Sequence, residues 1–315
     1  MDQRLRLSIV TCCALAAFVA FPAGSMVRAQ IDADPSEGAS DESVQPTKNQ
    51  PASGTRPERP RWQPIGRLDP NRVREASGIV KSRQYPDIFW THGDSLNPAV
   101  LFAFRLDGEL VAEVPVPEAP NTDWEDIAID DDGHLYIGDL GNNFGLFAWR
   151  FVYVIDEPDP FADPPTHAKL ITRYRYGFDD DRFDAESLYV IGEQMFIIDK
   201  PRSGKATLFE LMAESPGTLK PTARGKLPLV MVTGADVSRD QKWLVVSAVR
   251  QALVFSMDDQ LRPVLNRPLG SVVYPRGQIE ACCFDGNDLV FLDESGHIYK
   301  VTQRQWEANT SFVSP

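Results

Sequence analysis

The chain has 315 residues, of which 43% are hydrophobic and 10% are aromatic, enough for one large hydrophobic core or two small ones. Its formal net charge of -13 argues against nucleic acid and anionic membrane surfaces as partners, although a local basic pocket stays possible. The sequence contains no phosphate-binding P-loop, no HExxH motif and no Gly-x-Ser-x-Gly elbow, which argues against the enzyme classes that those motifs define.

Residues 1–29 are predicted to be a secretory signal peptide. Arg4 and Arg6 precede an apolar run, and the small-residue sequence "VRA" ends at Ala29, where we expect cleavage. The apolar run is shorter than the ~20 residues that cross a bilayer, which favours export to the periplasm or the medium over a membrane anchor. Cleavage would remove three arginines and one aspartate and leave a net charge of -15.

The rest of the chain is predicted to contain one β-rich domain. Residues 30–60 are rich in Pro, Ser and charge and lack apolar periodicity, so we expect a disordered spacer. Short apolar runs broken by Gly, Pro and Asp follow from Trp62 onward, without a long amphipathic pattern. We therefore expect an all-β domain over residues 61–303 and a C-terminal tail over residues 304–315.

Five stretches of this domain align, and each is followed by a turn and a second apolar run. They read "EASGIV", "EDIAID", "ESLYVI", "ADVSRD" and "EACCFD", beginning at Glu75, Glu125, Glu186, Ala235 and Glu280. Third and fourth runs follow in four units, but the fifth unit lacks a fourth run, which residues 61–69 can supply. This pattern predicts a five-bladed β-propeller of four-stranded blades, with the N-terminal strand closing the last blade.

Acidic residues recur where the first predicted strand of each unit begins and where the second ends. The first strand of a blade lines the central channel and the second runs antiparallel to it, so both positions lie at one mouth of the channel. Strand starts carry Glu125, Glu186 and Glu280, with Glu75 or Ser77 in the first unit, and strand ends carry Asp94, Asp139, Asp199 and Asp293. The predicted mouth also contains His92, Asn142, Asn143, Arg202 and Glu294.

Carboxylates that converge near an axis repel one another, which raises their pKa values and destabilises the fold unless a cation neutralises them. Oxygen ligands without His or Cys suit calcium, which accepts six to eight oxygens. The fourth unit has no acid at this position, so the hydroxyl of Thr233 or a backbone carbonyl would have to serve. The alternative is that the repeated Glu is a structural signature, hydrogen-bonded to backbone amides.

The run "ASGIVKSRQYPDIFWTHGDS … DWEDIAID … LYIGDLGNN … DAESLYV … VTGADVS … QIEACCF" resembles a family of exported bacterial propeller proteins over residues 65–300. More remotely, it is similar to the calcium-activated nucleotidases (apyrases), five-bladed propellers with one axial calcium held by a Ser or Glu from each inner strand. The resemblance implies Ser77, Glu125, Glu186 and Glu280 as calcium ligands, with Thr233 in the fourth blade. The substrate-binding motifs of the nucleotidases have no match here, so the resemblance supports fold and metal better than nucleotide hydrolysis.

Three functions follow from these residues. The leading one is a calcium-supported hydrolase of nucleotides or other phosphoesters, in which Lys200 and Arg250 hold a phosphate and Asp139 positions water. The second is a non-catalytic binding propeller for a small molecule, glycan, peptide or envelope partner, and the third is a glycosidase. Lys200, Arg202 and Arg250 converging on a polar pocket would favour phosphate, whereas aromatic side chains lining it would favour sugar. We expect a monomer without a membrane span.

Overall fold

The computed structural model describes residues 62–308, apart from 143–144, 165–166, 179–182 and 275–277. The predicted signal peptide, the predicted spacer and Asn143 lie outside the described residues. All the described residues belong to one compact unit. Within the described part, none of the helices has both the length and the apolar character to cross a membrane.

The described residues form an all-β fold in which strands follow one another as antiparallel meanders. The first sheet contains β2 (Ala76–Lys81), β3 (Phe89–Gly93), β4 (Val100–Phe104) and β5 (Leu110–Pro115). A later four-stranded sheet contains β14 (Val232–Val237), β15 (Trp243–Ala248), β16 (Gln251–Met257) and β17 (Pro263–Val273).

An eight-stranded sheet lies between these two in the sequence. Its first half contains β6 (Trp124–Ile129), β7 (His134–Asp139), β8 (Arg150–Asp156) and β9 (Leu170–Tyr176). Its second half contains β10 (Ala185–Ile191), β11 (Gln194–Asp199), β12 (Ala206–Ser215) and β13 (Thr218–Leu227). The halves join through a short parallel pairing of Thr218 and Leu219 with Arg175 and Tyr176. Each half is otherwise an antiparallel meander like the neighbouring sheets.

The last sheet joins the two ends of the domain. It contains β18 (Ile279–Asp285), β19 (Asp288–Asp293), β20 (His297–Val301) and the two-residue strand β1 (Gly66–Arg67). Gly66 pairs with Ile298 and Arg67 with His297, which confirms the predicted pairing of the N-terminal segment with the end of the fifth unit. The strand is shorter than residues 61–69, but the amides of Ile65 and Leu68 on either side of it also donate to the carbonyls of Ile298 and Gly296, at 2.8 and 2.9 Å.

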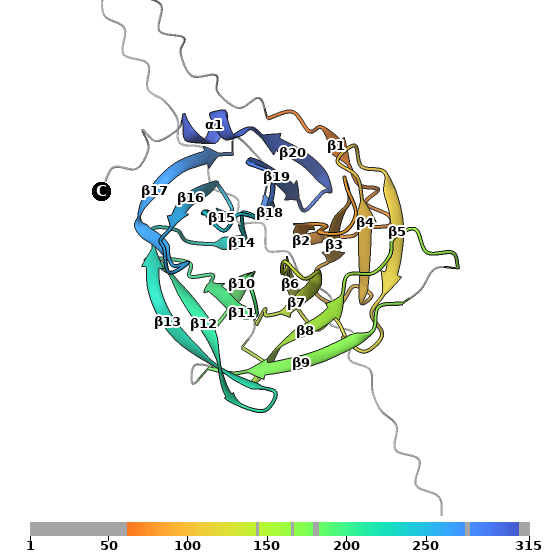
Figure 1. The fold of residues 1–315 in the computed structure, drawn as a ribbon, viewed down its shortest axis with the longest axis horizontal. Helices are drawn as coiled ribbons and strands as arrows, with labels where there is room; N and C mark the ends of the chain where they lie inside the picture. The colour runs from red at the N-terminus through yellow and green to blue at the C-terminus, as the bar shows by residue number, and fades with distance from the viewer. Residues whose placement is uncertain (1–61, 143–144, 165–166, 179–182, 275–277, 309–315) are drawn as a thin grey trace, which may run out of the picture. The chain divides into compact units, whose positions relative to one another are not determined.

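The position of each strand follows from its sequence. The strands β2, β6, β10, β14 and β18 begin the five repeated units, and they are almost continuously buried, as expected for short apolar runs covered on both faces. The outer strand β9 alternates half-buried and exposed residues, with Ile171 and Arg173 on its exposed side. Each of the five inner strands contacts the next in chain order, and β18 contacts β2, so the five surround a common centre (Figure 1).

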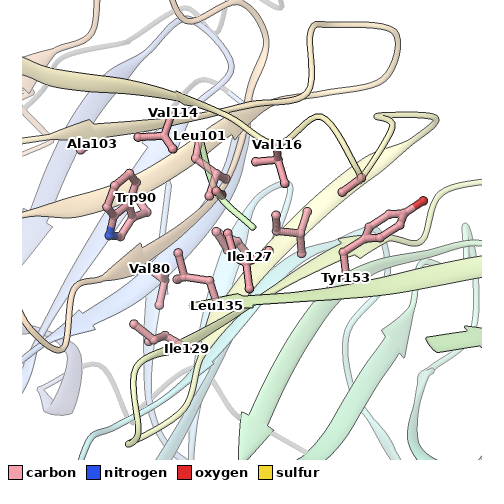
Figure 2. Packing of buried hydrophobic residues seen from close by; sticks show 14 of the residues in the cluster. Val80, Trp90, Leu101, Ala103, Val114, Val116, Ile127, Ile129, Leu135 and Tyr153 are labelled. Atoms are coloured by element: carbon pink, nitrogen blue, oxygen red, sulfur yellow. The ribbon is translucent and has the colours of Figure 1, made fainter. Parts of the chain in front are cut away.

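The core lies between neighbouring sheets rather than within any one of them. Between the first sheet and the β6–β9 half, Val80 and Trp90 pack with Leu101, Ile127 and Leu135 (Figure 2). Burying such large apolar side chains supplies most of the favourable free energy of folding. The inner strands are therefore held in place by packing on both sides, which fixes the residues at their ends.

A short helix ends the described chain. α1 (Gln303–Glu307) contacts β17, and Trp306 is fully buried, with its indole Nε1 donating to the Asn287 carbonyl at 3.0 Å. The predicted tail over residues 304–315 thus begins inside an ordered element. The buried Trp306 side chain anchors this short helix to the sheet. A helix of five residues is too short to show a periodic apolar pattern in the sequence.

Candidate functional site

A β-bulge near the beginning of each inner strand creates the site. In β6, β10, β14 and β18 the residue after the first paired residue has no partner in the ladder, because the pairing register shifts there. Those residues are Glu125, Glu186, Thr233 and Glu280. In β2 the shift comes one residue later, at Gly78, and Ser77 pairs with His92. A bulge takes a residue out of the ladder and re-aims its side chain. Four of the five residues predicted as calcium ligands therefore occupy equivalent positions, and Ser77 lies directly before the bulge of β2.

Four of these five residues line one small cavity of about 100 Å³. Its lining brings together predicted residues from the beginning, middle and end of the domain. The lining residues are Glu75, Ala76, Ser77, Asp94, Glu125, Glu186, Lys200, Gln278, Glu280 and Glu294. Among the described residues of this lining, Lys200 is the only cationic side chain, against six carboxylates, so this part of the cavity is strongly anionic and polar.

Thr233 does not line the cavity. Its side chain is buried and its hydroxyl shares a 3.1 Å hydrogen bond with the Ser247 hydroxyl. Ser77 lines the cavity, but its hydroxyl donates to the Glu125 carbonyl at 2.7 Å. Both hydroxyls thus have partners within the fold, and the three glutamates carry the charge of the bulge positions.

The aspartates predicted at the ends of the second strands do not form one ring. Asp139, Asp199 and Asp293 pair with the first residues of their inner strands, whereas Gly93 occupies that register position in the first unit. Asp94 is one residue further along, in register with Lys200 and Glu294, and these three line the cavity. The one-residue offset changes which way a side chain points.

The three aspartates in register with Gly93 accept backbone hydrogen bonds instead. Asp139 Oδ1 accepts from the Asp123 amide at 2.6 Å, and Asp199 Oδ1 accepts from the Thr207 amide at 2.6 Å. Asp293 Oδ1 accepts from the amides of Ser295 at 3.0 Å and His297 at 2.8 Å. Their carboxylates hold turns and strand starts, which is the usual local role of Asp side chains.

The remaining predicted residues that the structure describes do not line the cavity. His92 is fully buried, with Nδ1 3.1 Å from the Gly93 carbonyl, and burial lowers its pKa to about 4. Asn142 is buried, and its Oδ1 accepts from the amides of Leu146 and Phe147. Arg202 and Arg250 are exposed outside the cavity lining. Of the three cations that could have marked a phosphate site, only Lys200 reaches the pocket.

Burial dominates the electrostatics of the cavity. It raises the pKa of Glu280 to about 7, and it raises the pKa values of Glu125 and Glu186, where neighbouring carboxylates add to the shift. Lys200 forms an ion pair with Glu186 and opposes the shift of that group. Burial disfavours the charge of Lys200, but Glu186 and the other carboxylates outweigh it and raise the lysine pKa.

The residues present fit a hard cation. The Glu125 side chain is 5% exposed, and no hydrogen-bond donor among the described residues reaches its carboxylate. A buried carboxylate without donors is costly unless a cation lies beside it. Asp94, Asp123 and Glu125 each place one oxygen within 4.8 Å of the other two. Such a set of oxygens without sulfur or imidazole suits calcium.

Two acidic residues near the cavity were missed in the sequence. Asp123 lies two residues before Glu125, and burial and the Asp94 carboxylate raise its pKa to about 7. Its place corresponds to Glu75 in the first unit, a signal that the alignment of the units could have given. Asp126 lies on the other side of Glu125 and is fully buried, with its oxygens accepting from three backbone amides.

Comparisons with known proteins give remote similarities only. No family model matches the chain, and no curated protein matches it. The Dos1 propeller is 12% identical with a TM-score of 0.36, over 72% of this chain and 58% of that one, so the chain spans well under two thirds of its length. A nidogen/laminin complex structure is 11% identical, with a TM-score of 0.43 over 70% of this chain and 73% of that one. Virginiamycin B lyase from Staphylococcus aureus is 12% identical, with a TM-score of 0.38 over 72% and 66%.

Proposed function

We propose that residues 66–301 form a five-bladed β-propeller that binds a hard divalent cation, calcium first, at the acidic mouth of its channel. Support for the blade count comes from the five inner strands that contact one another in a closed series and from the bulge that each of them carries. The observation that carries the cation is the Glu125 carboxylate, buried in an anionic cavity without a donor among the described residues.

Charge favours a bound cation over a cavity of protons alone. Six ionised carboxylates and one ammonium would give the lining a formal charge of -5. Protonation can relieve part of this charge, as the raised pKa of Glu280 indicates. A divalent ion relieves it at neutral pH without holding the carboxylates protonated, and calcium tolerates the irregular oxygen geometry of such a pocket. Calcium sites in exported modules need only fill at 10⁻⁴–10⁻³ M, as known extracellular sites do.

The cavity supports a binding propeller better than a phosphoester hydrolase. One calcium ion would leave its formal charge at -3, which repels phosphate. Arg202 and Arg250 lie outside the lining, and the Lys200 ammonium is already paired with Glu186. We therefore place a non-catalytic, cation-dependent binding function first, with a polar or cationic group of a small molecule, glycan or peptide as the ligand. None of the described residues that line the cavity is aromatic, so a glycosidase subsite has the least support.

Hydrolysis remains the second candidate on one observation. Lys200 lies at the cavity, and a ligand phosphate that displaced Glu186 would gain a charge-assisted hydrogen bond from it. Asp139, with a pKa raised to about 6 by burial, would be the base, although its oxygens hold the Asp123 amide and the Tyr153 hydroxyl. A panel of nucleoside phosphates and simple phosphoesters, with and without calcium, tests this candidate directly.

The cation itself is tested by thermal unfolding of the full chain. A ligand that binds only the folded state stabilises it by about 2.7 kcal/mol at a hundredfold excess over Kd. We expect chelator to lower Tm by several degrees and calcium to restore it better than magnesium. Glu125→Gln should blunt this response, whereas Glu193→Gln, exposed in the β10–β11 turn, should not. A Tm unaffected by chelator, with no metal in elemental analysis of the purified protein, would remove the proposal.

A further inference from the structure

We propose that the cation lies off the channel axis, between Asp94, Asp123 and Glu125, and that Lys200 is a built-in counter-cation for the opposite wall of the cavity. This inference rests on the proposed cation binding and assigns the ion a position within it. In this arrangement the ligands do not form a symmetric ring, and the cavity has two different halves. In one half Lys200 neutralises Glu186, and in the other half Asp94, Asp123 and Glu125 can bind an exchangeable ion.

The first half is formed by Lys200 and Glu186. Lys200 follows β11 directly, and its backbone amide donates to the Asp184 carbonyl at 3.0 Å, which fixes the start of the side chain. Its Nζ forms an ion pair with Glu186 Oε1, and the two side chains are 14% and 5% exposed. A buried ammonium held this way satisfies the carboxylate that would otherwise be an axial ligand. Glu186 therefore has little to offer a second cation.

The second half lies on the β6 side of the cavity. Asp123, Glu125 and Asp94 come from the segment before β6, from the β6 bulge and from the end of β3. One oxygen of each lies within 4.8 Å of the other two, a spacing that a single ion can bridge. Glu125 is the only one of the three whose carboxylate is both 5% exposed and without a donor among the described residues. This buried, unpaired group is what points to a ligand.

Gly141 shows which way these carboxylates face. A Cβ added at Gly141 would collide with Glu125 Oε1 and Asp123 Oδ2, so both oxygens face the same bare backbone. The amides of Leu140 and Gly141 donate to the Asp123 carbonyl at 3.1 and 3.2 Å, which holds this backbone in place. Glu125 Oε1 thus lies close to Asp123 Oδ2. The absence of a side chain at 141 leaves room for the two carboxylates to converge.

The arrangement predicts opposite effects for residues of the two halves. Asp123→Asn removes a ligand charge and should weaken calcium binding at least about tenfold. Gly141→Ala should do the same without touching a charge, because its methyl group displaces the ends of two flexible side chains. Glu280→Gln changes a cavity carboxylate outside the three proposed ligands and should weaken binding by about threefold at most. Lys200→Gln removes the competing cation and should strengthen binding about tenfold or admit a second ion.

The test is isothermal titration of the full chain with calcium chloride alone, with elemental analysis for stoichiometry. Glu193→Gln is the surface control, and Tm in chelator shows that each variant folds. Losses at Asp123→Asn and Gly141→Ala, with a gain at Lys200→Gln, are the expected result. If the wild type binds calcium but Glu280→Gln loses it as strongly as Asp123→Asn, or Lys200→Gln shows no gain, the off-axis position is wrong while the cation site stands. If the wild type binds no calcium, the proposed function and this inference fall together.

Discussion

Asp126 offers a test of how the inner strands are held around the cavity. It is fully buried, and Oδ2 accepts from the amides of Leu188 at 2.9 Å and Ala235 at 3.2 Å, while Oδ1 accepts from the Ile127 amide at 2.9 Å. Those amides belong to β10, β14 and β6, so one carboxylate joins three inner strands. Asp126→Ala would leave all three donors buried without a partner.

The magnitude follows from the cost of unsatisfied donors. Each buried donor left without a partner costs about 1–3 kcal/mol, so three of them cost about 3–9 kcal/mol. An opposing effect reduces this loss: burial raises the pKa of Asp126 despite its three donors, so the carboxylate itself is held at a cost that the substitution removes. We therefore expect the low end, a loss of about 3 kcal/mol in the free energy of unfolding.

Asp126→Asn is the matched variant. Its single carbonyl oxygen can still accept from Leu188 and Ala235, while its amide faces the Ile127 donor and loses that bond. It should cost about 1–3 kcal/mol, less than Asp126→Ala. Urea unfolding in chelator at neutral pH measures both values. Hydrogen exchange should show faster exchange of the Leu188 and Ala235 amides in the alanine variant only.

The outcome can refute the reasoning in two ways. If Asp126→Ala unfolds within about 0.5 kcal/mol of the wild type, the three hydrogen bonds do not hold the strands together. If Asp126→Asn is the less stable of the two variants, burying its amide group against the Ile127 donor costs more than leaving all three donors without a partner. The first result would mean that packing alone positions the bulges.

Two further predictions concern the pH dependence of stability and the pairing of β1 with β20. In chelator, Asp123 and Glu280 have pKa values of about 7 in the folded state, above the values near 4 of an unfolded chain. The folded state therefore binds more protons between these values, and its stability should fall as pH rises from about 4 to 7. A higher Tm at pH 7.5 than at pH 5.5 in chelator would contradict this, and calcium should reduce the pH dependence. Deleting the chain through Asp69 removes β1 and exposes the edge of β20, so light scattering should show aggregation, whereas deletion through residue 60 should leave the protein soluble. A soluble, equally stable product of the longer deletion would argue against closure by β1.

The inner strands and their bulge residues could be predicted because the units repeat. Each of the five aligned stretches forms the innermost strand of its meander, and Glu125, Glu186 and Glu280 lie at equivalent bulges. The ends of the second strands cannot be aligned by residue identity alone, because aspartates at the ends of different second strands hold different register positions. Asp94 resembles Asp139 in the sequence, but hydrogen-bond pairing sets it in register with the following residue. A bulge adds one residue to one strand, and the sequence pattern does not show whether an acidic residue comes before or after the shift in register.

The negative charge of the cavity is distributed unevenly, and the repeated sequence pattern does not show this. Five aligned residues at the starts of the inner strands suggest an ion at equal distance from all of them. However, the Ser77 hydroxyl donates to the Glu125 carbonyl, and the Thr233 hydroxyl shares a hydrogen bond with the Ser247 hydroxyl. Of the three glutamates left, one is paired with Lys200, a residue in register with Asp94 and Glu294, which are acids in other units. A single change of sign at one repeat position therefore moves the uncompensated negative charge toward Glu125. The distribution of uncompensated charge around the cavity depends on the residues of all five units together. Aligning the units therefore identifies the residues at the cavity, but not the side of the cavity on which a cation would bind.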